Sequence, residues 1–350
     1  MDRPTSTETT ALTPIARVLA EGDRMRELLD DPGETRVSEP ILPLFLAALR
    51  LARGGPLVCV LPDDAQARDA AEGASWFLGE ERVGLFASRG VRWGSGLEPP
   101  PHLVGERARA LEVLAAGGLV CASALGAAEG IPPEGSRPEP IVLRGGDEPG
   151  VEGLAEHLAL AGYERVAQAE ERGQFAVRGG IVDVFPSTGR EPVRVELFGD
   201  EIESLRAFSP FTQRTLHELD EATVYPAAER LAGDLEPMLV DDEAGEAPPV
   251  PADLVAPLPP PHLVWQADEV EDVVREELGA GIELGDALRV TQLPAGQRHS
   301  FEAQRPAVAA RGLAEAERDL LAFVRGGNRV VVTFAYLGEA LRTKALLRRV

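Results

Sequence analysis

The sequence has 350 residues, a length that predicts two or three domains. Of these residues, 44% are hydrophobic and 27% are charged, a composition typical of a folded globular chain. Its formal net charge of −23 argues against bulk attraction to nucleic acid or to an anionic membrane, because both are negatively charged. No apolar run approaches the roughly 20 residues that span a bilayer, and the polar N-terminus lacks the apolar centre of a signal peptide, so we expect a cytoplasmic chain with no membrane partner.

Helical and strand-like segments alternate in the first third of the chain. Apolar periodicity and capping signals predict helices over residues 12–29, 41–53, 64–78 and 104–116, and apolar runs predict strands over residues 57–61, 83–86 and 119–122. This alternation is typical of α/β architecture with a parallel sheet. We expect an N-terminal helical segment over residues 1–35 and the first half of an α/β domain over residues 36–138.

The strands that follow are bunched together, which predicts a small α+β domain inserted into the α/β chain over residues 139–226. The second half of the α/β domain is expected over residues 227–350, with a Pro-rich excursion over residues 247–261. Its predicted strands span residues 263–265, 288–291 and 329–334, and its predicted helices span residues 313–323 and 338–350. Because the last helix has no capping signal, we expect a truncated chain or the first part of a longer one.

Two tight hairpins are predicted within the inserted domain. Gly179-Gly180 and Gly199-Asp200 are two-residue turn signals, and the flanking residues alternate between apolar and polar, which indicates an antiparallel sheet with one wet face. With a two-residue loop, Glu196 faces Glu203, an unfavourable pairing of like charges. Either the loop is longer, or this face awaits a partner.

The sequence offers few groups for catalysis, and we expect no catalytic, cofactor-binding or metal site. A Walker phosphate loop requires a Gly-Lys dipeptide, and the corresponding position, before the helix over residues 41–53, holds Ser38-Glu39-Pro40. The five histidines show no ligand spacing. Cys59 and Cys121 lie in short apolar runs and are expected to be buried free thiols.

The segment FAVRGGIVDVFP…PVRVELFGDEIESLRAFSPFTQRTL resembles the excision-repair family that UvrB and the transcription-repair coupling factors (Mfd) share. It resembles the small domain through which both bind UvrA. The segments HLVGERARALEVLAAGGLVCASA and FEAQRPAVAARGLAEAERDLLAFVRGGNRVVVTF are also similar to Mfd. The resemblance implies a degenerate P-loop-like domain with no Walker A motif, carrying the inserted UvrA-binding domain.

Two departures favour the coupling factors over UvrB. The phosphate loop is lost at Ser38-Glu39-Pro40, and a short Gly/Pro connector over residues 86–104 stands where UvrB inserts an aromatic-rich hairpin that grips DNA. The resemblance then implies an adaptor that recruits UvrA after RNA polymerase stalls. It also implies that RNA polymerase and double-stranded DNA are bound only by regions absent here, and that the C-terminal part of the full-length protein covers this surface.

The resemblance assigns UvrA contacts to Arg178, Arg194 and Phe198. Glu196, Glu203 and Arg206 are further candidates for UvrA binding. Turn positions are assigned to Gly179, Gly180, Gly199 and Asp200. The alternative is a structural role without partner contact, in which Arg194 forms an ion pair with Glu196 or Glu203 and Phe198 packs against a loop. Asp183 is expected to accept backbone hydrogen bonds. Gln213 and Arg214 either tie the last strand to the sheet or extend the contact surface.

Two other classes of function remain open at the level of sequence. A UvrB-like ATPase requires a nucleotide site. A free-standing α/β enzyme requires a pocket with convergent titratable groups.

Overall fold

The computed structural model describes residues 10–93, 95, 97–231, 255–293, 296–303, 313–327, 330, 332 and 337–346. The chain divides into two compact units, residues 1–302 and residues 303–350, which are described separately. The second unit contributes α9 (Leu313–Arg325) and α10 (Leu337–Leu346), where helices are predicted. The strand predicted over residues 329–334 and the excursion predicted over residues 247–261 lie partly outside the described residues. Within those residues, no helix is long and apolar enough to cross a membrane.

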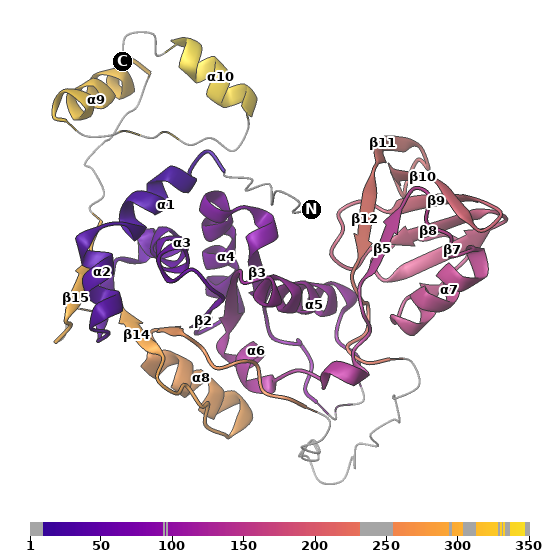
Figure 1. Cartoon of the computed structure of the whole chain (residues 1–350), viewed down its shortest axis with the longest axis horizontal. Helices are drawn as coiled ribbons and strands as arrows, with labels where there is room; N and C mark the ends of the chain where they lie inside the picture. Colours follow the sequence, from indigo (N-terminus) through magenta and orange to yellow (C-terminus); the bar gives the residue numbers. More distant parts are fainter. Residues whose placement is uncertain are drawn as a thin grey trace, which may run out of the picture. The chain divides into compact units, whose positions relative to one another are not determined.

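A parallel sheet organises the α/β lobe, with described strands in the order β15-β1-β14-β13-β2-β4-β3 (Figure 1). The strands are β1 (Thr35–Val37), β2 (Leu57–Leu61), β3 (Val83–Phe86), β4 (Leu119–Ser123), β13 (Leu263–Trp265), β14 (Leu288–Thr291) and β15 (His299–Phe301). β2 and β4 are buried along their whole length, as expected for strands covered on both faces. The predicted parallel α/β sheet is confirmed, and the two short strands that were not predicted, β1 and β15, extend it.

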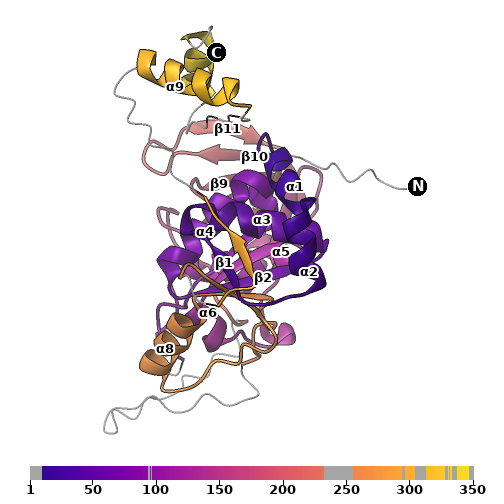
Figure 2. The ribbon, with the colours of Figure 1, turned by 90° about the vertical axis from the view of Figure 1, so that its left-hand side faces the viewer.

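Helices cover both faces of this sheet (Figures 1 and 2). One core joins the strands to α1 (Thr13–Ala20), α2 (Asp23–Asp30), α3 (Leu42–Arg53) and α4 (Asp64–Leu78). The other joins them to α5 (Pro101–Ala115), α6 (Ala124–Glu129) and α8 (Ala267–Leu278). Short 3-10 turns lie at Glu39–Ile41, Glu80–Arg82 and Glu134–Ser136. The helices α6 and α8 were not predicted.

The N-terminal segment forms two helices where the sequence predicts one helix over residues 12–29. Gly22 separates α1 from α2 with extended backbone, ψ 152°. A glycine inside a helix costs about 1 kcal/mol relative to alanine, which favours a break at this position. Ala16, Met25 and Leu28 are buried in the core, so the segment docks on the α/β lobe.

Two neighbouring aspartates fix the start of α4. Asp63 caps the helix, because its Oδ1 accepts a hydrogen bond from the Gln66 amide at 2.8 Å. Asp64 instead accepts hydrogen bonds from the Ser88 amide and hydroxyl, at 2.8 and 2.7 Å. The carboxylate of Asp64 therefore ties α4 to the segment that follows β3.

Asp64 should make the stability of the α/β lobe sensitive to acid. Burial raises the pKa of Asp64, but hydrogen bonds from Ser123 and Ser88 and the charge of Arg68 outweigh burial and lower the pKa below 3.8. A lowered carboxylate pKa stabilises the fold above the unfolded pKa, and this stability is lost as the pH falls through the folded pKa. We expect Asp64→Asn to flatten the fall in unfolding free energy below about pH 4, as measured by urea denaturation. A slope equal to that of the wild type contradicts this role, and Asp63→Asn controls for altered capping.

The β lobe comprises a small pair of strands, one helix and a larger sheet with the order β11-β10-β9-β8-β7-β6. Its elements are β5 (Ile141–Arg144), α7 (Val151–Leu160), β6 (Glu164–Arg165), β7 (Gln174–Arg178), β8 (Ile181–Phe185), β9 (Val193–Phe198), β10 (Glu201–Phe208), β11 (Thr215–Leu219) and β12 (Glu221–Val224). Neighbouring strands are antiparallel, as predicted, except that β6 runs parallel to β7.

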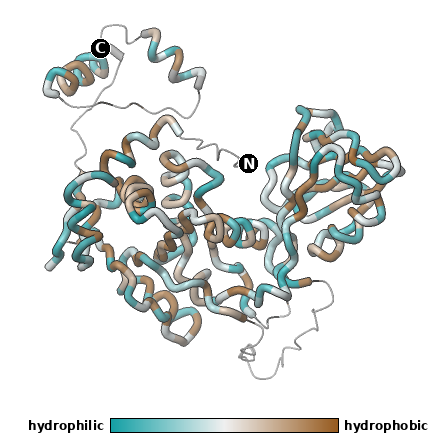
Figure 3. The backbone as a smooth tube through the Cα atoms, viewed as in Figure 1, coloured by the Kyte–Doolittle hydropathy of each residue, from teal (hydrophilic) through white to brown (hydrophobic). Residues whose placement is uncertain are grey.

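One face of the larger sheet packs on α7, and hydrophilic and hydrophobic residues alternate along its strands (Figure 3). β5 pairs with β12 so that Ile141 lies opposite Val224. The first and last strands of the β lobe therefore lie side by side.

Candidate functional site

The solvent side of the larger sheet brings together the residues that the resemblance assigns to partner binding. The cross-strand register places Asp183 opposite Arg194, and Arg194 opposite Arg206. Side chains alternate between the two faces of a strand, so the same face carries the following residues. We call this the outer face: Arg178, Ile181, Asp183, Arg194, Glu196, Phe198, Ser204 and Arg206.

A buried carboxylate lies at the centre of the outer face. The side chain of Asp183 is only 1% exposed, and it accepts two hydrogen bonds from Arg194, at 2.7 and 2.9 Å. It also accepts a hydrogen bond from Arg178 Nη2 at 2.5 Å. The expectation that Asp183 binds backbone groups is therefore wrong, because its described partners are two guanidinium groups. A bidentate arginine–carboxylate pair of this kind fixes both position and orientation.

Arg194 is mostly buried, and several contacts fix the position of its guanidinium. Its side chain is 18% exposed, and its guanidinium lies 4.5 Å from the centre of the Phe208 ring. Its Nη2 also donates a hydrogen bond to Gln213 Oε1 at 3.1 Å. The hydrogen bonds with Asp183 raise the pKa of Arg194 against the opposing effect of burial. Its ion-pair partner is Asp183, rather than Glu196 or Glu203 as the structural alternative expected.

Phe198 is exposed beside a tight turn. Phe198 pairs with Glu201, so Gly199 and Asp200 form the turn, and Gly199 has a φ of +64° that glycine adopts easily. The Phe198 side chain does not tuck against a loop, because the residue is 83% exposed. At the neighbouring hairpin, Arg178 pairs with Ile181 across Gly179 and Gly180. Short turns between paired strands give this aromatic residue a rigid base.

A β-bulge removes the expected pairing of Glu196 with Glu203. The register shifts between Ile202 and Ser204, so that Glu196 lies opposite Ser204. The Ser204 hydroxyl donates to Glu196 Oε2 at 2.8 Å, and Arg206 forms an ion pair with the same oxygen at 3.2 Å. The two-residue loop is therefore compatible with this sheet, because the extra residue of the bulge displaces Glu203.

Sequence reasoning missed a second group of charged residues, which is buried where the segment that follows β12 meets the α/β lobe. We call Arg89, Arg107, Glu129 and Glu229 the junction cluster. Glu229 accepts hydrogen bonds from Arg89 at 2.6 Å and from Arg107 at 3.0 Å, and Glu129 lies 3.9 Å from Arg107. Burial raises the pKa of Glu129 and lowers that of Arg107. No local motif identifies the cluster, because Glu229 is 140 residues from Arg89.

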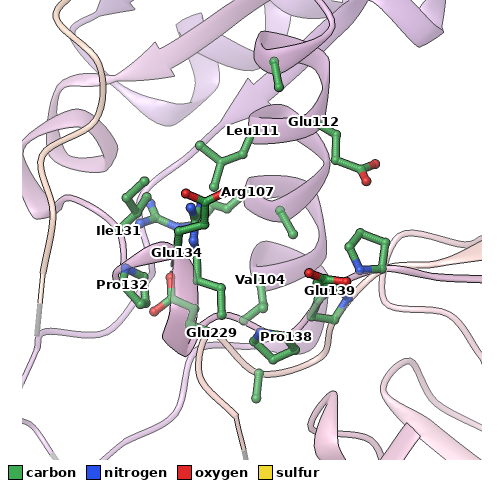
Figure 4. A pocket seen from close by; sticks show the side chains of 16 residues that line it. Val104, Arg107, Leu111, Glu112, Ile131, Pro132, Glu134, Pro138, Glu139 and Glu229 are labelled. Carbon is green, nitrogen blue, oxygen red and sulfur yellow. Dashed lines mark hydrogen bonds and ion pairs between the residues drawn. The ribbon is translucent and has the colours of Figure 1, made fainter. Parts of the chain in front are cut away.

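A cavity of about 260 Å³ opens beside this cluster, between α5 and the segments around Pro132, Pro138 and Glu229 (Figure 4). The Arg107 guanidinium donates hydrogen bonds to Glu229 and to the carbonyls of Ala87 and Gly130, at 3.0, 2.7 and 2.6 Å. These donors of Arg107 are therefore engaged within the protein, and the charged residues Glu112, Glu134, Arg137 and Glu139 also line the cavity.

Over the ranges that the structure describes, no group of three or more His, Cys, Asp or Glu residues could hold a metal ion. Cys59 and Cys121 are buried free thiols, as predicted, and burial raises the pKa of Cys121 to about 12. These cysteines are therefore packing residues.

Comparison with known proteins places the outer face within a recognised domain. Residues 141–229 match the family model described as the UvrB interaction domain. The transcription-repair-coupling factor of Mycobacterium bovis is 36% identical over 202 residues, which cover 55% of this chain and 16% of that protein. The factor of Myxococcus xanthus is 36% identical over 200 residues, which cover 54% of this chain and 17% of that protein. The UvrABC system protein B of Thermosipho africanus is 41% identical over 89 residues, which cover 25% of this chain and 14% of that protein.

The fold and these matches define a parallel α/β lobe joined to a UvrB interaction domain. More particularly, the chain carries a UvrB-like module of the kind found in Mfd, the transcription-repair coupling factor. The aligned part spans about a sixth of the length of these coupling factors.

Proposed function

We propose that this chain is an adaptor in transcription-coupled nucleotide excision repair and that it recruits UvrA through the outer face. The observation that supports this most directly is Phe198, an aromatic residue that is 83% exposed on a rigid hairpin within the matched domain. Aromatic and arginine side chains dominate the energetics of protein interfaces. Arg178, whose side chain is 47% exposed, supplies an accessible guanidinium on the same face.

The names of the relatives support the wider role. They are coupling factors and a component of the UvrABC system, and these names support a role of the proposed adaptor in excision repair. Contacts with RNA polymerase and DNA are assigned to regions outside this chain. We also propose that, in a full-length protein, the C-terminal part covers the outer face when UvrA is not bound.

We further infer that these 350 residues lack ATPase activity. A phosphate site at the β1–α3 connection needs several free backbone amides. The Ser38 amide instead donates to the Phe301 carbonyl at 3.0 Å, and Pro40 has no amide hydrogen. The alternative, a UvrB-like ATPase, requires ATP binding by the isolated chain, which a titration with labelled ATP tests directly. A free-standing α/β enzyme is disfavoured because the charged groups of the junction cluster pair with one another.

Phe198→Ala is expected to weaken UvrA binding by at least about 1–2 kcal/mol, or roughly tenfold. The substitution removes an exposed ring and leaves the buried side of β9 intact, so the fold should survive. Isothermal titration of UvrA with wild-type and variant chains measures the effect.

The matched control is Trp76→Ala, which removes a half-exposed aromatic side chain on α4 of the α/β lobe. Trp76→Ala should bind UvrA like the wild type. Equal affinity of Phe198→Ala and the wild type, or no binding by the wild type, rejects the proposed adaptor function.

A further inference from the structure

A second aromatic side chain is exposed at the end of the same sheet. Phe211 is 95% exposed, more than any other large hydrophobic residue among those described. It lies in the 209–214 loop, which joins β10 to β11 and follows the outer-face strand that carries Arg206. A single exposed hydrophobic residue is ordinary on a protein surface, so the significance of Phe211 depends on how its loop is held.

The 209–214 loop is closed by its own hydrogen bonds. The Ser209 amide donates to the Arg214 carbonyl at 2.9 Å, and the Gln213 amide donates to the Ser209 carbonyl at 2.8 Å. The Gln213 side-chain amide donates to the Pro210 carbonyl at 2.9 Å. These bonds close a compact turn around Phe211, so the ring projects from an ordered support.

Gln213 connects this turn to the outer face. Its backbone has a φ of +60°, a left-handed conformation that is uncommon for residues other than glycine. Its Oε1 accepts a hydrogen bond from Arg194 at 3.1 Å. Arg194 is in turn fixed by the buried carboxylate of Asp183. A chain of hydrogen bonds therefore runs from the centre of the outer face to the loop that presents Phe211.

We propose that Phe211 is a second apolar anchor for UvrA and that Arg194 is a positioning residue, which orients the 209–214 loop through Gln213. This inference rests on the proposed function, since it extends the same binding surface beyond Phe198. It assigns Gln213 to both roles left open by the sequence: a tie to the sheet and a support for the contact surface.

The arrangement also indicates what the partner must offer. Phe198 and Arg194 are four residues apart on β9, which corresponds to about 13 Å along the strand. Phe211 lies in the loop that follows the end of β10, and this end pairs with the part of β9 that carries Arg194. Arg178 and Arg194 carry two positive charges against the one negative charge of Asp183. The surface therefore suits a partner with two separated apolar recesses and an acidic group between them.

Titrations of UvrA with variant chains test the anchor and its support. Phe211→Ala should weaken binding about tenfold. Gln213→Asn should weaken it about threefold, because asparagine tolerates the left-handed conformation but is too short to keep the bond with Arg194. Trp76→Ala should stay within about twofold of the wild type. If Phe198→Ala weakens binding and Phe211→Ala does not, the second anchor is rejected while the proposed function stands. If the wild type does not bind UvrA, both are rejected.

A double-mutant cycle tests the positioning role. If Arg194 acts through the loop, the double variant Arg194→Ala/Phe211→Ala should lose less UvrA affinity than the product of the fold-losses of the two single variants. A fold-loss of the double variant that equals this product overturns the positioning role. If Arg194→Ala fails to fold, a double-mutant cycle of Gln213→Asn and Phe211→Ala tests the same hydrogen-bonded connection. Its fold-losses are compared in the same way.

Discussion

Replacement of Glu229 by alanine is expected to lower the free energy of unfolding by about 3–5 kcal/mol. The Glu229 side chain is 7% exposed and accepts hydrogen bonds from two arginines, Arg89 at 2.6 Å and Arg107 at 3.0 Å. Removing one partner of a buried ion pair leaves the remaining charge without solvent or compensation, and this is more costly than the net value of the pair itself.

Neither arginine can respond by losing its proton, because the guanidinium group stays charged in proteins. After the substitution, Arg107 keeps Glu129 at 3.9 Å and two backbone carbonyls. Arg89 keeps its contact with the Trp93 ring, 3.4 Å from the ring centre. These contacts do not replace a carboxylate shared by both guanidinium groups, so the two positive charges repel each other in a poorly hydrated site.

The control for this prediction is Glu221→Ala, which breaks a surface ion pair with the same 2.6 Å distance as the pair between Glu229 and Arg89. Glu221 lies 2.6 Å from Arg144, and both side chains are about half exposed. Because exposed pairs are screened by water, this loss should cost less than about 1 kcal/mol. Urea denaturation of both variants measures the difference. Equal midpoints for Glu229→Ala and Glu221→Ala contradict a stabilising role for the junction cluster.

The local features of the fold could be predicted because they depend on neighbouring residues. The turn chemistry of Gly179-Gly180 and Gly199-Asp200 agrees with the hairpins observed, and the apolar run over residues 57–61 agrees with β2. Period and turn type are encoded within a few residues. The parallel sheet and the antiparallel sheet could be predicted from the sequence for this reason.

The features that the sequence did not reveal depend on contacts between distant segments. Glu229 meets Arg89 across 140 residues, and no spacing rule connects them. The bulge at Glu203 shifts the register of β10 and replaces a repulsive pair with a hydrogen bond from Ser204. Phe211 could have been noticed as an aromatic residue between turn-forming neighbours, but its exposure follows from how the 209–214 loop closes.

Substitution of Asp183 by alanine is expected to lower the free energy of unfolding by about 2–3 kcal/mol and to weaken UvrA binding about tenfold. Asp183 is buried, and it accepts hydrogen bonds from both Arg178 and Arg194. The expected loss of stability is smaller than for Glu229→Ala, because Arg194 is 18% exposed and can recover some hydration. The loss of affinity follows because both arginines lose the anchor that orients them.

The matched variant Arg178→Ala separates these two effects. The Arg178 side chain is 47% exposed, and its removal leaves Asp183 paired with Arg194 through two hydrogen bonds. Stability should therefore change by less than about 1 kcal/mol, while UvrA binding still weakens because an accessible guanidinium is lost. If Asp183→Ala is no more destabilising than Arg178→Ala in urea, the carboxylate does not organise the outer face. If Asp183→Ala binds UvrA like the wild type, the orientation of the two arginines does not contribute to recognition, and the exposed aromatic residues alone must account for it.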